Sequence, residues 1–195
     1  MKQRRFLAGL LLLLGLTGCT AAPTQTADGA PWEERWVRVG SLLGVEPPED
    51  FSLDDNKDVL APSGMFYATW VQGEAKDHTN EDGEAALVYD AQIYVLLKHC
   101  GSDAEAQTEA TSWQTREALS YETGTAESWT CAGQDFTVLP LEQAADDTNP
   151  YPGGIAAFAV RGSWAICVEL VAAEGDSSAW APSLEAFLTG FHYSE

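Results

Sequence analysis

The sequence predicts an α+β fold in which an antiparallel sheet of about six strands is covered by helices. Short runs rich in β-branched and aromatic residues follow one another across tight turns, and consecutive hairpins of this kind build an antiparallel sheet. Amphipathic stretches separate the runs and must lie on at least one face of the sheet. The expected order is α-β-β-α-β-β-β-β-α, within a single globular domain over residues 31–195 that is long enough to bury one core.

The first expected element is a helix over 31–44, PWEERWVRVGSLLG. Pro31 suits the first turn of a helix, and Gly44 suits its end. Apolar residues recur along one face of this stretch at helical spacing. They are Trp32, Trp36, Val39 and Leu43.

Two strands are expected next, over 65–71 and over 85–98. The polar segment between them contains Asp82-Gly83, which is a turn signal for a hairpin. The second run is longer than an ordinary strand, so we expect a bulge or bend near Asp90-Ala91.

A second helix is expected from Ser102 to about Leu119. Ser102 and Glu105 have the spacing of a capping box, in which each side chain satisfies a backbone N–H at the start of a helix. The residues expected to point inward are Ala106, Ala110, Trp113 and Leu119.

Two further hairpins and a closing helix complete the expected fold. Strands 127–131 and 135–141 flank a turn at 132–134, and strands 155–161 and 164–171 flank Gly162-Ser163. The end of the chain, SSAWAPSLEAFLTGFHYSE, predicts a capped amphipathic helix. Its apolar stripe, at spacing i, i+3, i+4 and i+7, comprises Leu184, Phe187, Leu188 and Phe191.

From about Phe51 to the end, this succession of hairpin, long helix, two hairpins and a closing helix resembles the PsbP-like α/β/α sandwich in topology. The segment LEAFLTGFHYSE is similar to the short helix and aromatic segment with which members of that family commonly finish. Known members include photosystem accessory proteins and bacterial lipoproteins without an assigned activity. The resemblance therefore implies a non-enzymatic role.

The N-terminus has the layout of a secretory signal. Lys2, Arg4 and Arg5 precede an almost unbroken apolar run over 6–16. About 12 apolar residues reach roughly 18 Å as a helix, which is short of a hydrocarbon core of about 30 Å. We therefore expect a signal peptide over 1–18 and no spanning helix at this position.

The tetrad Leu16-Thr17-Gly18-Cys19 resembles the lipobox of bacterial lipoproteins. The resemblance implies that the chain is cut before Cys19 and that Cys19 carries a diacylglycerol and often a further acyl chain such as palmitate. Two or more acyl chains give stable anchoring. Residues 19–30 are then a lipidated cysteine and a flexible tether, and the protein faces the extracytoplasmic side of the cell membrane. The alternative is an ordinary secretion signal with a chance cysteine.

The chain is strongly acidic, with 30 acidic and 10 basic residues and a formal charge of −20. Three basic residues and no acidic residue lie within the first 18, so the mature chain would carry −23. This charge argues against nucleic acid as a partner and against docking of the domain on anionic lipid heads. A cationic partner or calcium would need a site that charge alone does not supply.

Three cysteines follow the anchor, and none is spaced as a CxxC motif. Their hydrophobic neighbours favour buried free thiols, and a Cys100–Cys131 bridge is the alternative. The three cysteines are Cys100, Cys131 and Cys167.

No motif predicts a catalytic residue, a metal site or a cofactor. His78, His99 and His192 lack the spacing of metal ligands, and only a meeting of His99 and Cys100 with Cys167 would suggest a metal site. The series Asp54-x-Asn56-x-Asp58 begins like a calcium loop but lacks the required glycine.

The aromatic residues least committed to a core predict a binding surface, to which the loop 144–154 would contribute. We therefore expect a lipid-anchored binding or accessory protein of the cell envelope, with a protein, peptide or glycan as partner. An envelope hydrolase would need carboxylates such as Asp90 and Glu169 to converge with one pKa raised. A purely structural envelope protein would lack a concave aromatic site. The possible binding surface comprises Trp113, Trp129, Tyr151 and Trp180.

Overall fold

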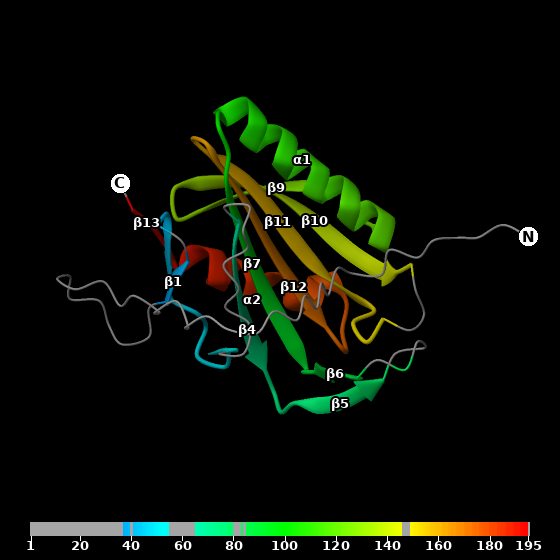
Figure 1. Ribbon diagram of the computed structural model, residues 1–195. Coiled ribbons are helices and arrows are strands. Elements are labelled where there is room, and N and C mark those ends of the chain that lie inside the picture. Colours follow the sequence, from blue (N-terminus) through cyan, green and yellow to red (C-terminus); the bar gives the residue numbers. More distant parts are fainter. Residues whose placement is uncertain are drawn as a thin grey trace, which may run out of the picture.

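The computed structural model describes residues 37–39, 41–54, 65–79, 83, 85–145 and 149–194. They form an α+β fold whose main element is an eight-stranded antiparallel sheet (Figure 1). The strand order is β3-β4-β7-β12-β11-β10-β8, with β9 also paired to β10. The bounds are β3 Ser52–Leu53, β4 Met65–Gln72, β7 Ala91–His99, β8 Tyr121–Thr123, β9 Glu127–Cys131, β10 Gln134–Ala144, β11 Gly153–Arg161 and β12 Trp164–Ala172.

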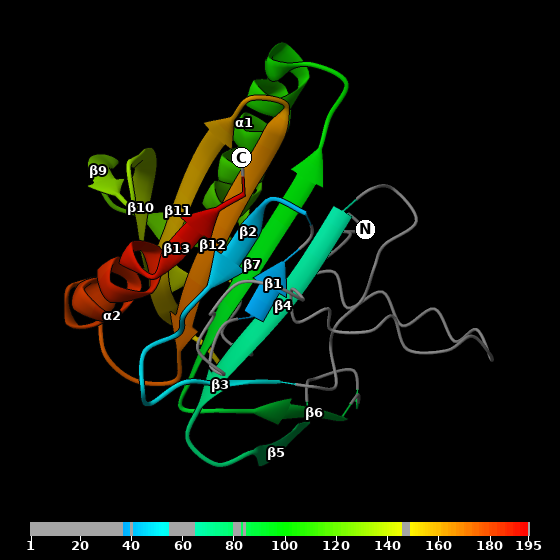
Figure 2. The ribbon, with the colours of Figure 1, turned by 90° about the vertical axis from the view of Figure 1, so that its left-hand side faces the viewer.

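The two faces of this sheet carry separate apolar cores. Helix α1, Asp103–Ser120, covers one face. Helix α2, Ser177–Thr189, covers the other together with a three-stranded sheet. Figure 2 shows α2 and the small sheet on one side of the large sheet and α1 on the other. The small sheet has the order β1-β2-β13, with β1 Val37–Val39, β2 Leu43–Val45 and β13 Phe191–Tyr193.

Helix α1 begins at the expected capping box. Ser102 Oγ accepts a hydrogen bond from Glu105 N–H at 3.3 Å, and Glu105 Oε2 accepts one from Gly101 N–H at 2.8 Å. Ala106, Ala110 and Trp113 are buried, as the sequence predicts. Leu119 was expected inward as well, but it is 77% exposed. The helix turns Glu117 toward the sheet instead, because Glu117 follows Trp113 by four residues and Leu119 does not lie on that face.

Helix α2 confirms the apolar stripe of the closing segment. Leu184, Phe187 and Leu188 are fully buried. Phe191 is buried too, but it is the first residue of β13 because the helix ends at Thr189. A Cβ atom at Gly190 would lie 2.3 Å from Glu46 O, so only glycine allows the chain to pass from helix to strand here.

The prediction of a helix over 31–44 is wrong for the residues of this segment that the structure describes. Residues from Val37 to Val45 form the antiparallel pair β1–β2, and β13 adds to β2 on the other side. Val39, Leu43 and Val45 are buried against the α2-side core, and this tertiary contact favours strands over the helical spacing of the sequence. Pro31, Trp32 and Trp36 lie outside the described residues.

The long run 85–98 is divided at the expected bend. Its first part is β6, Ala85–Val88, which pairs with β5, Lys76–Thr79, in a separate two-stranded ribbon. Its second part is β7, which begins after Asp90. Figures 1 and 2 both show the ribbon beyond the ends of β4 and β7. Gly83 has a φ of +80°, whereas Asp82 of the expected turn lies outside the described residues.

The last two hairpins agree with the sequence. Strands β9 and β10 meet across Ala132 and Gly133, both at positive φ, and β11 and β12 meet across Gly162-Ser163. The count of about six strands was too low, because β3 and β8 are too short to produce an alternating pattern.

Candidate functional site

The four aromatic residues expected to form a surface do not gather in one place. Trp113 is only 2% exposed and Tyr151 only 7%, so the expectation of a surface role is wrong for both. They belong to the core beneath α1, whereas Trp129 and Trp180 pack, partly buried, against the core on the α2 side. The indole of Trp129 donates to Glu127 Oε2 at 3.1 Å, and that of Trp180 donates to Glu174 O at 2.8 Å.

A different group of side chains comes together on the α1 side of the large sheet. Helix α1 lies over β12, β11, β10 and β8. Beside it, β4 and β7 place Tyr67 and Tyr94 on this face, and Glu169 of β12 is the cross-strand neighbour of Tyr94. All three side chains are partly exposed. We call Tyr67, Tyr94 and Glu169 the tyrosine face.

The two tyrosine rings of this face are stacked. Their centroids are 5.9 Å apart and their planes differ by 27°. Burial raises the pKa of Tyr67 to about 12, and it also raises the pKa of Tyr94 well above its ordinary value. Both hydroxyl groups therefore keep their protons at neutral pH and can donate hydrogen bonds.

Glu169 forms a carboxyl pair with Glu117 from the last turn of α1. Burial, reinforced by the neighbouring charge of Glu117, raises the pKa of Glu169 to about 8. Burial also raises the pKa of Glu117, which is 7% exposed and interacts with Glu169. Burial therefore favours the protonated form of both carboxyls. The Arg116 guanidinium lies 3.9 Å from Glu117 and offsets the remaining negative charge.

Unsatisfied polar atoms lie next to the tyrosine face. Thr69, opposite Tyr94 in the sheet register, and Gln92 are both almost fully buried. The Tyr94 hydroxyl donates to Gln92 Oε1. The Thr69 hydroxyl lies beside that of Tyr67. Within the part of the chain that the structure describes, however, neither Thr69 Oγ1 nor Gln92 Nε2 makes a hydrogen bond of normal geometry. A buried group in this state costs free energy unless something else binds it.

Two further tyrosines lie on this side of the sheet, and Tyr121 is near the carboxyl pair. Tyr151 accepts a hydrogen bond from Tyr89 N–H at 2.9 Å, and Tyr121 accepts one from Asn149 Nδ2 at 3.2 Å. Burial raises the pKa of Tyr151 to about 12 and that of Tyr121 higher still. These tyrosines therefore add neutral hydrogen-bonding groups to this side of the molecule.

The carboxylates considered for a hydrolase do not converge. Asp90 is half-exposed and pairs with Lys76 Nζ at 2.6 Å. Glu169 does have the raised pKa, but its partner is Glu117. Sequence reasoning missed Glu117 because a glutamate on the inner face of a helix breaks the apolar pattern. Its position four residues after Trp113 was the available signal.

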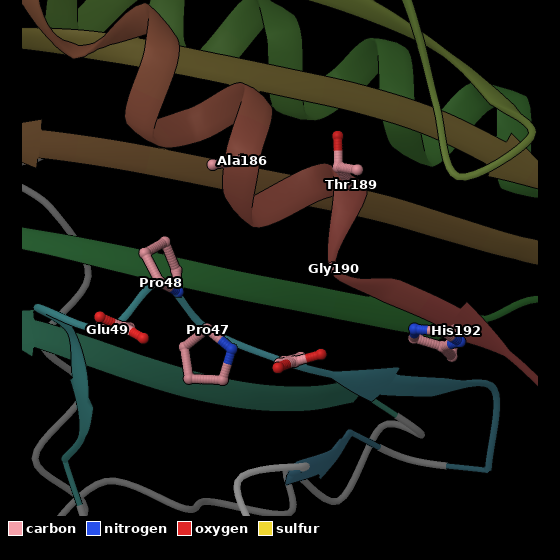
Figure 3. A pocket seen from close by; sticks show the side chains of 8 residues that line it. Pro47, Pro48, Glu49, Ala186, Thr189, Gly190 and His192 are labelled. Carbon is pink, nitrogen blue, oxygen red and sulfur yellow. The ribbon is translucent and has the colours of Figure 1, made fainter. Parts of the chain in front are cut away.

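An open groove of about 340 Å³ lies at the C-terminal end of α2 (Figure 3). The carbonyl oxygen of Gly190 accepts a hydrogen bond from Glu46 N–H at 3.0 Å, which joins the two walls. The lining contains two glutamates and the negative end of the helix dipole, so the groove is acidic. The lining residues are Glu46, Pro47, Pro48, Glu49, Ala186, Thr189, Gly190 and His192.

The three described cysteines are free and buried. Cys100 belongs to the core on the α1 side and Cys131 to the core on the α2 side, so the sheet separates them and the alternative of a bridge is wrong. His99 Nε2 lies 3.1 Å from Ser163 Oγ and its ring packs on Trp164. Among the described residues, no three His, Cys, Asp or Glu side chains are grouped to hold a metal ion.

The described helices are α1 and α2, and neither is long and apolar enough to cross a membrane. Cys19, the expected anchor, lies outside the described residues. A search against known protein families finds no match for this chain, and a search of curated proteins finds none.

Proposed function

We propose that this chain is a lipid-anchored, extracytoplasmic binding or accessory protein of the bacterial cell envelope. The lipobox-like Leu16-Thr17-Gly18-Cys19 supports attachment to the cell membrane through Cys19. The observation that carries the binding role is the tyrosine face, which combines stacked aromatic rings with neutral hydrogen-bonding groups on a partly exposed part of the sheet. Its partner would be a protein, a peptide or a glycan, and no cofactor is needed.

The arrangement of layers supports a PsbP-like α/β/α sandwich as the finer fold assignment. An antiparallel sheet lies between α1 on one face and α2 on the other, in the chain order expected for that family. The small sheet β1-β2-β13 adds to the α2 side. As an argument from fold alone, this likeness favours an accessory role over an enzymatic one.

The raised pKa of Glu169 favours one alternative, an envelope hydrolase that uses a carboxyl pair as acid and base. The contact between Glu169 and Glu117 weighs against it. Glycosidases hold their carboxyl groups about 5–5.5 Å or about 6.5–9.5 Å apart, which leaves room for the sugar or for a water molecule. Glu117 is almost fully buried on the inner face of α1 and interacts with Glu169, which leaves no such room at Glu117. A purely structural role does not account for the partly exposed stacked rings.

Metabolic labelling of the full chain with a palmitate analogue tests the anchor. The native chain should take up the label and fractionate with the membrane, and Cys19→Ala should do neither. Thr20→Ala, one position along, is the matched control and should behave like the native chain. Labelled Cys19→Ala protein in the membrane fraction would refute the proposal.

A further inference from the structure

We propose that the tyrosine face is a binding site for a neutral, hydroxyl-bearing ligand of the oligosaccharide class. The inference deepens the proposed binding role and rests on it. It is argued from the stacked rings, from two unpartnered polar groups and from the balance of charge.

The rings of Tyr67 and Tyr94 supply the apolar part of such a site. Sugar rings present C–H groups on one face and hydroxyls around the edge, and aromatic side chains pack against the C–H face. The stacked pair lies on strands β4 and β7 of the large sheet, so its positions are fixed by regular backbone pairing.

The unpartnered atoms supply the polar part. Thr69 Oγ1 can donate or accept a hydrogen bond, and Gln92 Nε2 can only donate. Among the described residues both atoms are buried without a partner. Gln92 is held in place by the Tyr94 hydroxyl, so the free Nε2 has a fixed direction. Tyr67 lies beside Thr69, and a rotation of its side chain, of the kind common on binding, would let a ligand hydroxyl reach Thr69 Oγ1 in its place.

The charge balance argues against an ionic ligand. The formal charge of −20 repels anions. Lys98 on the same face is bound to Glu109 at 2.6 Å, and Arg116 lies beside Glu117. Burial raises the pKa of both Glu169 and Glu117, which favours their neutral forms, and Arg116 lies 3.9 Å from Glu117 to offset the charge that remains. A neutral ligand with many hydroxyls matches these groups better than a cation or an anion.

Isothermal titration of the full chain, solubilised in a detergent without a sugar head group, tests the inference. The probes are chitotetraose and cellotetraose, which are neutral and differ in their acetamido groups. We expect saturable binding of at least one of them in the micromolar to millimolar range. Tyr67→Ala, which removes one ring of the stacked pair, should lower the affinity at least about tenfold.

Thr69→Val gives the sharpest test because it keeps the shape of the side chain and removes the unpartnered hydroxyl. We expect the melting temperature to stay level or rise, while the affinity falls about tenfold. Tyr193→Phe is the matched control, since it removes another buried hydroxyl without a described partner, on β13. Its affinity should equal that of the native chain.

Two results would overturn the inference. One is the absence of binding by the native chain to either probe, and the other is an unchanged affinity in both Tyr67→Ala and Thr69→Val. In either case Thr69 and Gln92 would be serving an ordered water. Membrane attachment through Cys19 is tested separately by the labelling experiment, so a failure of ligand binding would not contradict the anchor proposal.

Discussion

Glu169 in β12 and Glu117 in the last turn of α1 bring their carboxyl groups together between the helix and the sheet, and burial raises the pKa of both. The groups near this pair include Arg116 on α1 and the uncharged Tyr67, Tyr94, Tyr121 and Cys167. Strands β11 and β10 contribute the apolar side chains of Ala156, Phe158 and Leu141 to the core on this side of the sheet.

This pair makes stability depend on pH. The folded protein holds the proton of Glu169 up to about pH 8, whereas the unfolded chain releases it near the ordinary pKa of 4.5. Glu169 therefore does not lower the free energy of unfolding below about pH 4.5. The free energy of unfolding falls as the pH rises from about 4.5 to about 8, and Glu169 causes no further change above about pH 8. Glu169→Gln should remove this dependence and should be more stable than the native chain at about pH 8.5 but not at about pH 4.5. Thermal melts at both pH values measure the difference.

The exposed Glu122 of β8 provides the control for that experiment. Glu122→Gln changes the net charge by the same amount but does not touch the carboxyl pair. Its difference from the native chain should be small and similar at both pH values. If Glu169→Gln behaves in the same way, Glu169 does not hold a proton in the folded state.

Phe187 of α2 should be among the most costly side chains to truncate. It is fully buried and packs edge-on against Trp70 at 5.1 Å and Phe191 at 5.6 Å. Phe187→Ala should lower the free energy of unfolding by about 3–5 kcal/mol, and a chain that stops before Ser183 should show no cooperative melt. Circular dichroism melts test both. Glu185 is an exposed neighbour on the same helix, and Glu185→Ala should change the free energy of unfolding by no more than about 0.5 kcal/mol.

Gly154 of β11 should not tolerate any side chain. A Cβ atom there would lie 2.0 Å from Leu170 O, a backbone atom of the neighbouring strand in the middle of the sheet. Gly154→Ala should cost more than about 4 kcal/mol or prevent folding. Gly133 is the comparison: its Cβ would meet no atom within 4 Å, and its φ of +71° should make Gly133→Ala cost only about 1–2 kcal/mol. Equal urea midpoints for the two variants would contradict the expectation that a side chain at Gly154 collides with the backbone of β12.

The thiols of Cys100, Cys131 and Cys167 should be unreactive in the native protein. All three are buried, and burial raises the pKa of each thiol. Iodoacetamide should therefore modify them only after denaturant is added, and mass spectrometry without reductant should find three free thiols. A Cys100–Cys131 peptide pair would contradict the placement of these residues on opposite faces of the sheet.

Elements with strong local patterns could be predicted from the sequence. The capping box at Ser102, the hairpin at Gly162-Ser163 and the stripe of α2 each depend on residues close together in the chain. The segment around Val39 and Leu43 could not be predicted, because short apolar runs fit a helix and a strand equally well. Its partner strand, β13, comes from the other end of the chain.

The candidate site was harder to predict for the same reason. Glu169 could be named as a carboxylate of interest, but its raised pKa depends on Glu117, which lies on another element. Trp113 and Tyr151 were expected on a surface because the sequence gives the type of a residue but not how deeply its side chain is buried. The tyrosine face itself depends on the register of β4 with β7, which places Tyr94 opposite Thr69.

The central position of β7 between β4 and β12 has a consequence for the speed of folding. Its pairing with β12 joins His99 to Trp164, although α1 and strands β8 to β11 lie between β7 and β12 in the chain. Pairings this distant in sequence carry a loop-closure cost that must be met before their contacts form, and this slows folding. We expect stopped-flow refolding on a timescale of about milliseconds to seconds, with the local hairpin β11–β12 protected from hydrogen exchange earlier than β7.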